Sequence, residues 1–245
     1  MKRKIKDVIV SLSGWISTIL LLLSLYPVLV SLWLILFPFR HVRFKLIHGF
    51  ACMWAWLIVF FNPYWKVKVI NKEKLIRNRP CVFISNHQSM VDILLLFLLF
   101  IPFRFVAKIE LFRIPFLGWG MSMASYIPVD RKNRNSFPAM YHACETSLKE
   151  GVPVMIFPEG TRTMSGQLNA FKEGAFRIAI HNKVPIQPIV IKGSYEALPG
   201  KGLILNGPQY ITIKILDEIP YEQFPSYESR ELSLWFHSLY EKEFS

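Results

Sequence analysis

Two polar side chains near the middle of the chain have the types and spacing of a catalytic base and the acid that orients it. His87 follows a short apolar run, and Asp92 comes five residues later. The two would not share a face of one continuous helix, but Asp92 in a first helical turn can reach back to a His87 in the preceding loop. A carboxylate on imidazole fixes the tautomer and stabilises the imidazolium that forms when the ring accepts a proton. The spacing therefore predicts a general base.

This base has no protein nucleophile near it in the sequence. The chain contains no G-x-S-x-G pattern, and no cysteine lies near His87 or Asp92. The nucleophile is therefore expected to be a hydroxyl group of the substrate. A structural interpretation stays open at this point, in which Asp92 completes a capping box with Ser89 and His87 is only a turn residue.

A second polar block, Phe157–Arg162 (FPEGTR), follows another apolar run. Its Pro-Glu-Gly turn leaves backbone N–H groups free, and the fork-shaped guanidinium of Arg162 suits bidentate binding of a phosphate. Glu159 is expected to accept a hydrogen bond, for example from a glycerol hydroxyl, and a surface ion pair between Glu159 and Arg162 is the alternative. Further cations that could assist are Lys108, Arg131 and Lys172.

Metal binding is not predicted. His87 with two acids lacks the usual histidine-rich zinc spacing, and the cysteines form no ligand pattern. The three cysteines also form no disulfide framework, so a reducing compartment and three buried, free thiols are expected. They are Cys52, Cys81 and Cys144.

The elements that must position these groups are short strands that alternate with helices. The pattern predicts a mostly parallel sheet flanked by helices, which is an α/β fold. Five polar groups follow predicted strands, and in such a sheet ligands bind at the carboxyl ends of the strands. The predicted strands are 65–70, 81–85, 103–107, 126–129, 154–157, 185–191 and 210–215. The polar groups that follow them are at His87, Lys108, Asp130-Arg131, Glu159–Arg162 and Lys192.

Helices are predicted between these strands. Ser89 begins a capping-box pattern ahead of the apolar run 93–100. Ser136 is expected to cap a helix that ends before Gly151, the C′ residue. Two more helices are predicted at 174–181 and 231–243.

The first 64 residues differ from the rest in composition. Basic residues at positions 2, 3, 4 and 6 precede an uncharged stretch from 8 to 39, and a second uncharged stretch covers 46–65. A spanning helix needs about 20 apolar residues, so each stretch is long enough to cross a bilayer, the first with tilt or with a break at Pro27. We expect residues 1–64 to anchor the chain in a membrane, as two spanning helices or as a pair embedded in one leaflet. Residues 65–245 are expected to form the α/β domain.

The charge of the chain fits an anionic partner. Lys and Arg number 29 against 17 Asp and Glu, which gives a net charge of +12. The basic residues are scattered rather than gathered in one aromatic-interleaved patch, so nucleic acid is not predicted and a lipid partner is favoured.

Together these blocks resemble the 1-acylglycerol-3-phosphate acyltransferase (lysophosphatidic acid acyltransferase) family of the glycerolipid acyltransferase superfamily. The resemblance covers about residues 65–194 and rests on four blocks in the order typical of that family. They are 86–92 (NHQSMVD), 105–111 with 127–131, 157–163 (FPEGTRT) and 184–188 (VPIQP).

The resemblance implies an enzyme of phospholipid biosynthesis. It would transfer a fatty acyl chain from acyl-CoA or acyl-carrier protein to the sn-2 hydroxyl of lysophosphatidic acid, making phosphatidic acid without a cofactor. His87 would deprotonate that hydroxyl and Asp92 would orient His87, in the H-x₄-D motif. The residues implied in binding the acceptor are Lys108, Arg131, Glu159, Gly160, Thr161 and Arg162.

Two further expectations follow from this chemistry. Backbone N–H groups near the His87 turn are expected to stabilise the oxyanion that forms on the thioester. The stretches 93–103 and 112–123 are expected either to line a channel for the acyl chain or to pack in the core.

Other functions stay open from the sequence. A sister enzyme could use glycerol-3-phosphate or another lysophospholipid, and a non-catalytic phospholipid-binding membrane protein would tolerate loss of His87. A lipid hydrolase is disfavoured because no activated serine or cysteine is evident. Donor availability and the lack of a cysteine framework predict an active site at the cytoplasmic face, in a bacterial inner membrane.

Overall fold

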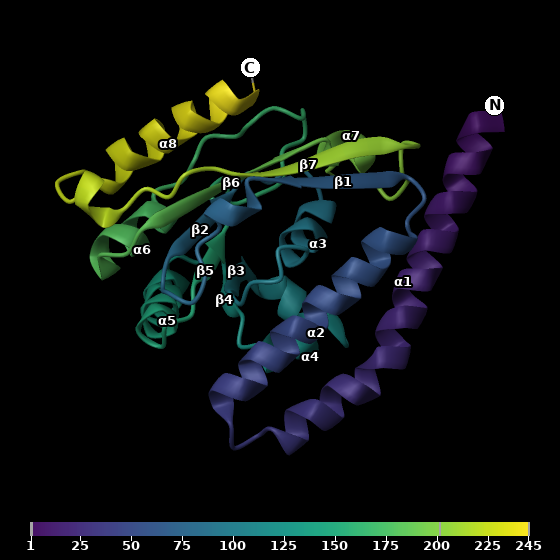
Figure 1. The fold of residues 1–245 in the computed structure, drawn as a ribbon, viewed down its shortest axis with the longest axis horizontal. Coiled ribbons are helices and arrows are strands. Elements are labelled where there is room, and N and C mark those ends of the chain that lie inside the picture. Colours follow the sequence, from purple (N-terminus) through teal and green to yellow (C-terminus); the bar gives the residue numbers. More distant parts are fainter. Residues whose placement is uncertain (1, 201, 245) are drawn as a thin grey trace.

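The structure, a computed structural model, describes residues 2–200 and 202–244, apart from the side chains of Lys2 and Arg3. A seven-stranded sheet runs through it in the order β1-β7-β6-β2-β5-β3-β4 (Figure 1). Neighbouring strands are parallel except β6 and β7, which are antiparallel. The strands are β1 (Trp65–Ile70), β2 (Val82–Ser85), β3 (Arg104–Lys108), β4 (Ile127–Val129), β5 (Val154–Ile156), β6 (Ile186–Lys192) and β7 (Gln209–Ile215).

All seven predicted strands are present, with boundaries that differ by at most one residue. The central strand β2 shows why a run of apolar residues predicted a strand here: all four of its residues are buried. Val82 and Ile84 belong to the hydrophobic core on one face, whereas Phe83 belongs to the core on the other. This period of two confirms a sheet covered on both faces, as the mostly parallel arrangement requires.

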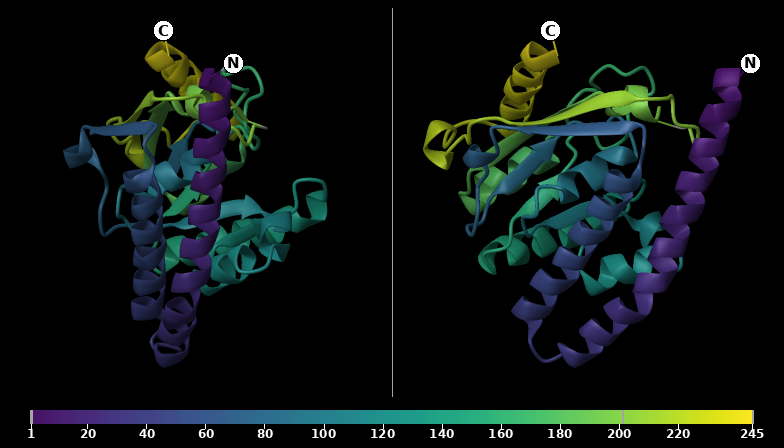
Figure 2. Two further views of the ribbon diagram at one scale, coloured as in Figure 1. Left: turned by 90° about the vertical axis from the view of Figure 1, so that its right-hand side faces the viewer. Right: turned by 45° about the vertical axis from the view of Figure 1, so that its right-hand side comes forward.

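Helices form a layer on each face of the sheet (Figure 2). The helices α5 (Phe137–Lys149), α6 (Gly174–Asn182) and α8 (Ser229–Phe244) share one core with Val82 and Ile84. The helices α2 (Arg40–Phe61) and α3 (Val91–Phe97) share the other core with Phe83. The short helices are α4 (Leu117–Met123), α7 (Ser194–Ala197), η1 (Lys72–Lys74), η2 (Ile109–Arg113), η3 (Arg134–Ser136) and η4 (Tyr221–Gln223).

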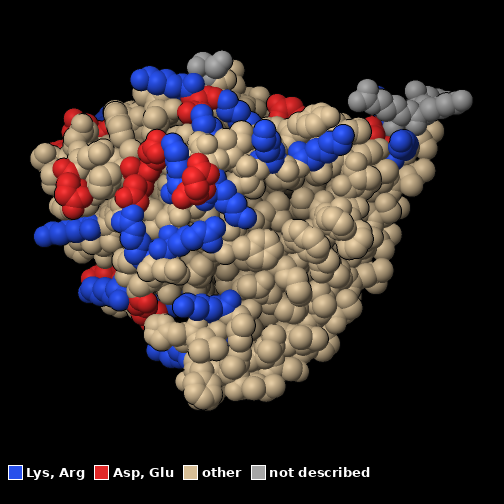
Figure 3. All heavy atoms as spheres, viewed as in Figure 1, with Lys and Arg blue, Asp and Glu red and all other residues tan. Residues whose placement is uncertain are grey.

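The N-terminal segment is a helical hairpin, α1 (Lys2–Ile35) followed by α2. Both helices are long and apolar enough to cross a membrane by length and composition, so they are candidate membrane anchors. The helix α1 continues through Pro27 instead of breaking there. The hairpin presents a broad face without charged side chains (Figure 3). Large apolar side chains of α1 are exposed, among them Ile9, Leu12 and Ile19.

The helix ends agree only partly with the sequence pattern. Gly151 adopts a φ of 75°, as the predicted C′ residue of α5 should. Ser136, however, does not cap α5, because its hydroxyl donates to the carbonyls of Asp130 and Asn133 at 2.9 and 2.8 Å. All three cysteines are free and buried, which confirms the prediction made for them.

Candidate active site

The turn after β2 brings His87 and Asp92 together. His87 Nδ1 lies 2.9 Å from Asp92 Oδ2, across the junction between the turn and the first turn of α3. The same oxygen accepts the backbone N–H groups of Gln88 at 2.6 Å and Ser89 at 2.7 Å. Asp92 is fully buried, so these donors stabilise a carboxylate that has no access to water. The contact predicted from the five-residue spacing is therefore present.

Half of the predicted capping box is also present, since Asp92 reaches back to the N–H of Ser89. The hydroxyl of Ser89 accepts the N–H of Val91 at 3.2 Å and donates to the carbonyl of Leu198 at 2.6 Å. One carboxylate thus serves both the helix start and the imidazole. The structural and catalytic interpretations of Asp92 do not exclude each other.

The imidazole ring of His87 is packed on an aromatic side chain. It stacks on Phe157, with ring centroids 3.9 Å apart and an interplanar angle of 13°. Phe157 in turn stacks with Phe105 of β3. No hydrogen bond reaches His87 Nε2 within the described residues, and 11% of the side chain remains exposed. The ring is therefore held at one nitrogen and on one face, while the other nitrogen can meet a substrate.

Glu159 joins the His87 turn to the loop that follows β5. Its Oε1 accepts the N–H of His87 at 2.6 Å, and its Oε2 accepts the N–H of Asn169 at 2.9 Å. Desolvation by burial raises the pKa of Glu159 to about 7; the two backbone hydrogen bonds oppose this shift, and the charge of Asp92 adds to it. The carbonyl of His87 also accepts the N–H of Thr163 at 3.0 Å. The turn is thus held on both sides by the loop containing the FPEGTR block.

The alternative ion pair between Glu159 and Arg162 does not occur within the described residues. Arg162 is half-buried, and its guanidinium has no hydrogen bond or ion pair among the residues that the structure describes. Thr161 beside it is exposed. Arg162 is therefore a cation without a partner among the described residues. It follows Glu159, which binds the backbone of His87, by three residues.

Gly160 provides a close approach for two cations. Its φ is 71°, which L residues with a side chain rarely adopt, and an added Cβ would lie 2.9 Å from Lys172 Nζ. The carbonyl of Gly160 accepts a hydrogen bond from Arg131 Nη1. Arg131 from the end of β4 and Lys172 from the loop before α6 thus meet at this turn, as the convergence of strand ends predicted.

Lys108 at the end of β3 is also near an acid. Its Nζ lies 2.9 Å from Glu110 Oε1, and both side chains are exposed. The hydrogen bond from Lys108 holds the pKa of Glu110 below its usual value, and the Glu110 backbone amide and the charges of Lys108 and Lys132 lower it further. Glu110 was not predicted as a site residue, although it follows Lys108 by two residues in the sequence.

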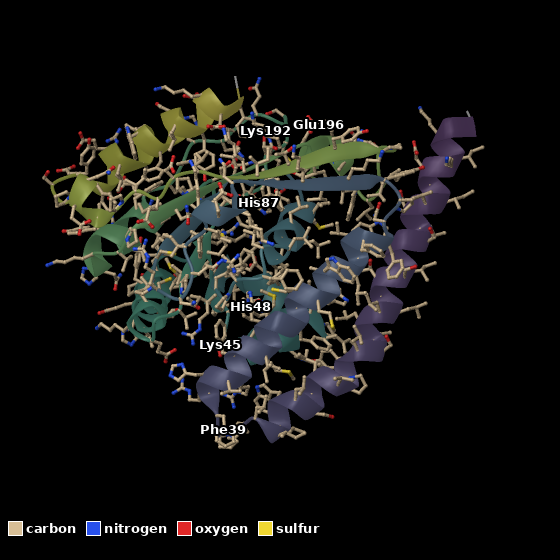
Figure 4. The ribbon with its side chains drawn as sticks, in the orientation of Figure 1. Phe39, Lys45, His48, His87, Lys192 and Glu196 are labelled. Carbon is tan, nitrogen blue, oxygen red and sulfur yellow. The ribbon has the colours of Figure 1, made fainter. Side chains whose placement is uncertain are left out.

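Two of the sequence predictions are wrong. Lys192 ends β6, but its ammonium donates to the carbonyl of Glu243 and lies over the ring of Phe244 in α8, so it points away from the site (Figure 4). The backbone N–H groups of His87, Gln88 and Ser89 are not free for an oxyanion, because they already bind Glu159 and Asp92. Glu159 is 72 residues from His87 in the sequence, and Asp92 is four residues from Gln88 and three from Ser89. These two carboxylates accept the N–H groups that an isolated turn would leave without a partner.

Several supporting residues carried little sequence signal. The side chain of Asn86 pairs with both the N–H and the C=O of Ile191 at 2.8 Å, which ties the His87 turn to β6. The hydroxyl of Tyr240 donates to the carbonyl of Ile84 at 2.9 Å and accepts the N–H of Ile189 at 3.1 Å, so it bridges β2 and β6. Tyr240 comes from α8, far along the chain, and no local pattern pointed to it.

The loop after α7 connects the site to the N-terminal hairpin. It accepts the hydroxyl of Ser89 at Leu198, and a Cβ on Gly200 would lie 2.6 Å from the carbonyl of Thr163. Further along this loop, the carbonyl of Leu203 accepts the indole N–H of Trp15 in α1 at 2.7 Å. Helix α1 is thereby linked to the His87 turn through a single loop.

The chain is similar to known proteins in sequence and in fold. The acyltransferase family model matches residues 66–192. A 1-acyl-sn-glycerol-3-phosphate acyltransferase of Pseudomonas aeruginosa is 31% identical over 181 residues, which are 70% of this chain and 69% of the relative. A chloroplastic 1-acyl-sn-glycerol-3-phosphate acyltransferase of Brassica napus is 36% identical over 178 residues, or 71% of this chain and 51% of the relative.

The chain spans about half the length of the plant and algal relatives that it matches. Among solved structures, it is similar to the crystal structure of the 1-acyl-sn-glycerophosphate acyltransferase PlsC from Thermotoga maritima. The TM-score is 0.81 at 24% identity, and the match covers 98% of this chain and 95% of that one. This likeness supports the fold.

Proposed function

This chain belongs to the acyltransferase family, and we propose that it transfers a fatty acyl chain from a thioester donor to the sn-2 hydroxyl of 1-acylglycerol-3-phosphate. The product would be phosphatidic acid, and the donor acyl-CoA or acyl-carrier protein. One observation carries the proposal: His87 is held by a buried carboxylate at Nδ1, while Nε2 has no partner within the described residues. Such a base, without a protein nucleophile beside it, suits activation of a substrate hydroxyl.

In the proposed reaction, His87 Nε2 takes the proton from the sn-2 hydroxyl as the oxygen attacks the thioester carbonyl. The tetrahedral intermediate then collapses and the C–S bond breaks. The imidazolium returns its proton to the leaving thiolate, which leaves as a thiol, so the protons balance. Asp92 stabilises the imidazolium between these steps and keeps Nδ1 protonated in the neutral ring. Proton transfer of this kind contributes about 10²–10⁴-fold to a rate.

The acceptor phosphate would be bound by the cations around the FPEGTR block. Arg162 is proposed as the main phosphate ligand because its guanidinium has no ion-pair partner among the described residues and can bind two oxygens at once. Lys108 and Lys172 would add positive charge, and the turn at Gly160 and Thr161 would supply the backbone that shapes the site.

Two residues predicted to bind the acceptor are proposed to position the site. Arg131 donates to the carbonyl of Gly160, and both oxygens of Glu159 are engaged by backbone N–H groups. Each therefore holds a loop that carries a substrate-contacting residue. Glu159 would keep the backbone of His87 in register with the FPEGTR block.

Residues 1–64 are proposed as the membrane anchor and 65–245 as the catalytic domain. Helix α2 is packed on the α/β domain along its length, through buried residues from Phe44 to Val59. Arg40 at its start lies 4.0 Å from Glu150 of that domain. A helix with both ends against the same domain cannot cross a bilayer alone. We therefore propose that the hairpin lies in one leaflet with its apolar face towards the lipid, at the cytoplasmic face of a bacterial inner membrane.

The proposal is tested by measuring acyl transfer with the purified chain in detergent. Labelled acyl-CoA would be offered with 1-acylglycerol-3-phosphate, glycerol-3-phosphate or lysophosphatidylcholine, and each reaction repeated with acyl-carrier protein as donor. Product from 1-acylglycerol-3-phosphate alone is expected. Product only from another acceptor would be consistent with the proposed mechanism but would show that the proposed acceptor is wrong. No product from folded protein with either donor would favour a phospholipid-binding protein without activity.

A further inference from the structure

A second group of cations surrounds a cavity far from the His87 turn. The cavity has a volume of about 430 Å³ and lies where α1 turns into α2. Arg104, which lines it, begins β3, whereas Lys108 of the candidate active site ends the same strand. The two sites therefore lie at opposite ends of the strands, the cavity at the amino end of β3 and the candidate active site at its carboxyl end. Figure 4 shows the same separation, with Phe39 of the cavity and His87 at distant points of the molecule.

Arginines outnumber acids in the lining of this cavity. Glu150 lies 2.6 Å from the guanidinium of Arg104 and 4.0 Å from that of Arg40, so one carboxylate faces two cations. Arg43 adds a third guanidinium, which donates to the carbonyl of Phe37 and lies over the rings of Trp33 and Phe37. The excess of positive charge suits an anion with several oxygens.

The start of α2 adds to this field. Helix α2 has 22 residues, no acidic residue in its first turn and no side-chain cap at Phe39. Its first N–H groups therefore remain without an intrahelical acceptor, and its dipole is positive at this end. Both effects act in the same direction as the arginines that line the cavity.

The surroundings of the cavity are apolar and exposed. Phe37, Phe39 and Val42 keep 57%, 61% and 50% of their surface exposed at the tip of the hairpin. The uncharged face of the hairpin continues from there, with Lys and Arg side chains along its border (Figure 3). A free phosphate would make no use of these side chains. A lipid could place its phosphate among the arginines and its acyl chains along the hairpin.

We propose that this cavity binds the phosphate headgroup of an anionic phospholipid from the surrounding membrane. The site is separate from the one proposed for acyl transfer. It would fix the turn of the hairpin, and with it the start of β3, at the level of the lipid headgroups.

Binding can be measured on the full chain in neutral detergent by native mass spectrometry, which identifies each ligand by its mass. The probes are short-chain phosphatidylglycerol, the matching phosphatidylcholine and inorganic phosphate. Because the proposed acyl-transfer site can also hold a phosphate, all variants would be made in an Arg162→Gln background. The test variant combines Arg40→Gln and Arg43→Gln. Its matched control combines Lys183→Gln and Arg230→Gln, two exposed cations distant from the hairpin in sequence, which changes the net charge equally.

Five results are expected. Phosphatidylglycerol should bind more tightly than phosphatidylcholine, and each arginine lost from the cavity should weaken that binding by about fivefold. The control variant should bind like the background protein. Glu150→Gln should act in the opposite direction and tighten binding, because it removes the carboxylate that competes for the arginines. Arg40→Lys with Arg43→Lys should bind less tightly than the background protein, since lysine lacks the bidentate fork.

Other results would overturn the proposal. If inorganic phosphate competes as strongly as the lipid, the cavity is a site for a soluble anion. If the test variant binds phosphatidylglycerol as tightly as the background protein, or if the control loses as much affinity, the arginines of the cavity do not form the site. Since no activity is measured, none of these outcomes depends on whether the chain transfers acyl groups.

Discussion

Two buried histidines, both labelled in Figure 4, differ in what surrounds them. Both have aromatic neighbours and a hydrogen-bonded Nδ1. His87 Nδ1 faces the carboxylate of Asp92 at 2.9 Å. His48 Nδ1 faces the hydroxyl of Tyr126 at 3.1 Å and packs among Phe44, Phe97 and Phe103. Burial and aromatic contact are common to both, so they do not separate the proposed catalytic histidine from a core histidine.

The difference lies in the charge of the partner and in the path to solvent. Asp92 is a buried acid stabilised by two backbone N–H groups, so it can stabilise a positive ring next to it. Tyr126 offers no such charge. His48 is only 2% exposed and lies within α2, whereas His87 lies at the carboxyl end of β2, where a ligand can approach. A fixed carboxylate at a strand end is therefore the feature that predicts chemistry.

Removing that charge is expected to have a large effect. Asp92→Asn can keep an oxygen for the two N–H groups but cannot stabilise an imidazolium. We expect kcat to fall by about 10²–10⁴-fold, with little loss of structure. Steady-state acyl transfer and circular dichroism at the same pH would measure both. A kcat within tenfold of the parent would show that the charge of Asp92 is not what distinguishes His87 from His48.

Glu159 is a further difference between the two histidines, because it holds the backbone of His87, whereas no such acid holds His48 among the described residues. Its pKa of about 7 exceeds the ordinary value of 4.5, so the folded state binds more protons between these values. The free energy of unfolding should therefore decrease as the pH rises from about 4.5 to about 7. The total contribution is ~3 kcal/mol.

Glu159→Gln should lack this slope. Denaturant unfolding in detergent across the pH range would compare the two chains. If the free energy of unfolding depends on pH equally in the parent and the variant, burial does not raise the pKa of Glu159.

Arg162 tests whether the cations at this edge of the sheet bind the acceptor. Loss of one charge-assisted contact in Arg162→Gln should raise KM for 1-acylglycerol-3-phosphate by about tenfold or more, because such a hydrogen bond contributes about 1.5–3 kcal/mol. Arg177→Gln, a change of the same type on the exposed face of α6, is the control. A similar KM in both variants would remove Arg162 from the proposed phosphate site.

Tyr126→Phe should have the smallest effect. It removes the hydroxyl that faces His48, and the expected cost is ~1 kcal/mol of stability with no change in kcat. Thermal unfolding and the transfer assay would be compared with the parent. A large loss of activity here would break the distinction between the two histidines.

The sheet was predictable from sequence because its strands are short runs of β-formers whose residues alternate between two cores. The contact between His87 and Asp92 was predictable for a related reason, since a loop residue and a first-turn residue five positions apart can meet. Both inferences use local geometry. They need no knowledge of how distant segments pack.

The errors arose where a competing partner, distant or local, already occupies the group in question. Glu159 and Asp92 occupy the N–H groups that were expected to bind an oxyanion. Lys192 turns towards α8 because the end of the chain lies beside β6. Ser136 bonds to carbonyls of the loop before it instead of capping α5. For Glu159 and Lys192 the partner comes from a distant segment that no local pattern encodes, whereas Asp92 lies within four residues of the N–H groups that it accepts.

The central claim is that His87 is the base for the acceptor hydroxyl and His48 is a core residue. The most direct test is the rate of acyl transfer from labelled acyl-CoA to 1-acylglycerol-3-phosphate by the parent, His87→Ala and His48→Gln, each confirmed as folded in the same detergent. We expect His87→Ala to lose about 10²–10⁴-fold or more and His48→Gln to keep the parental rate. A parental rate in His87→Ala, or an equal loss in both variants, would contradict the account.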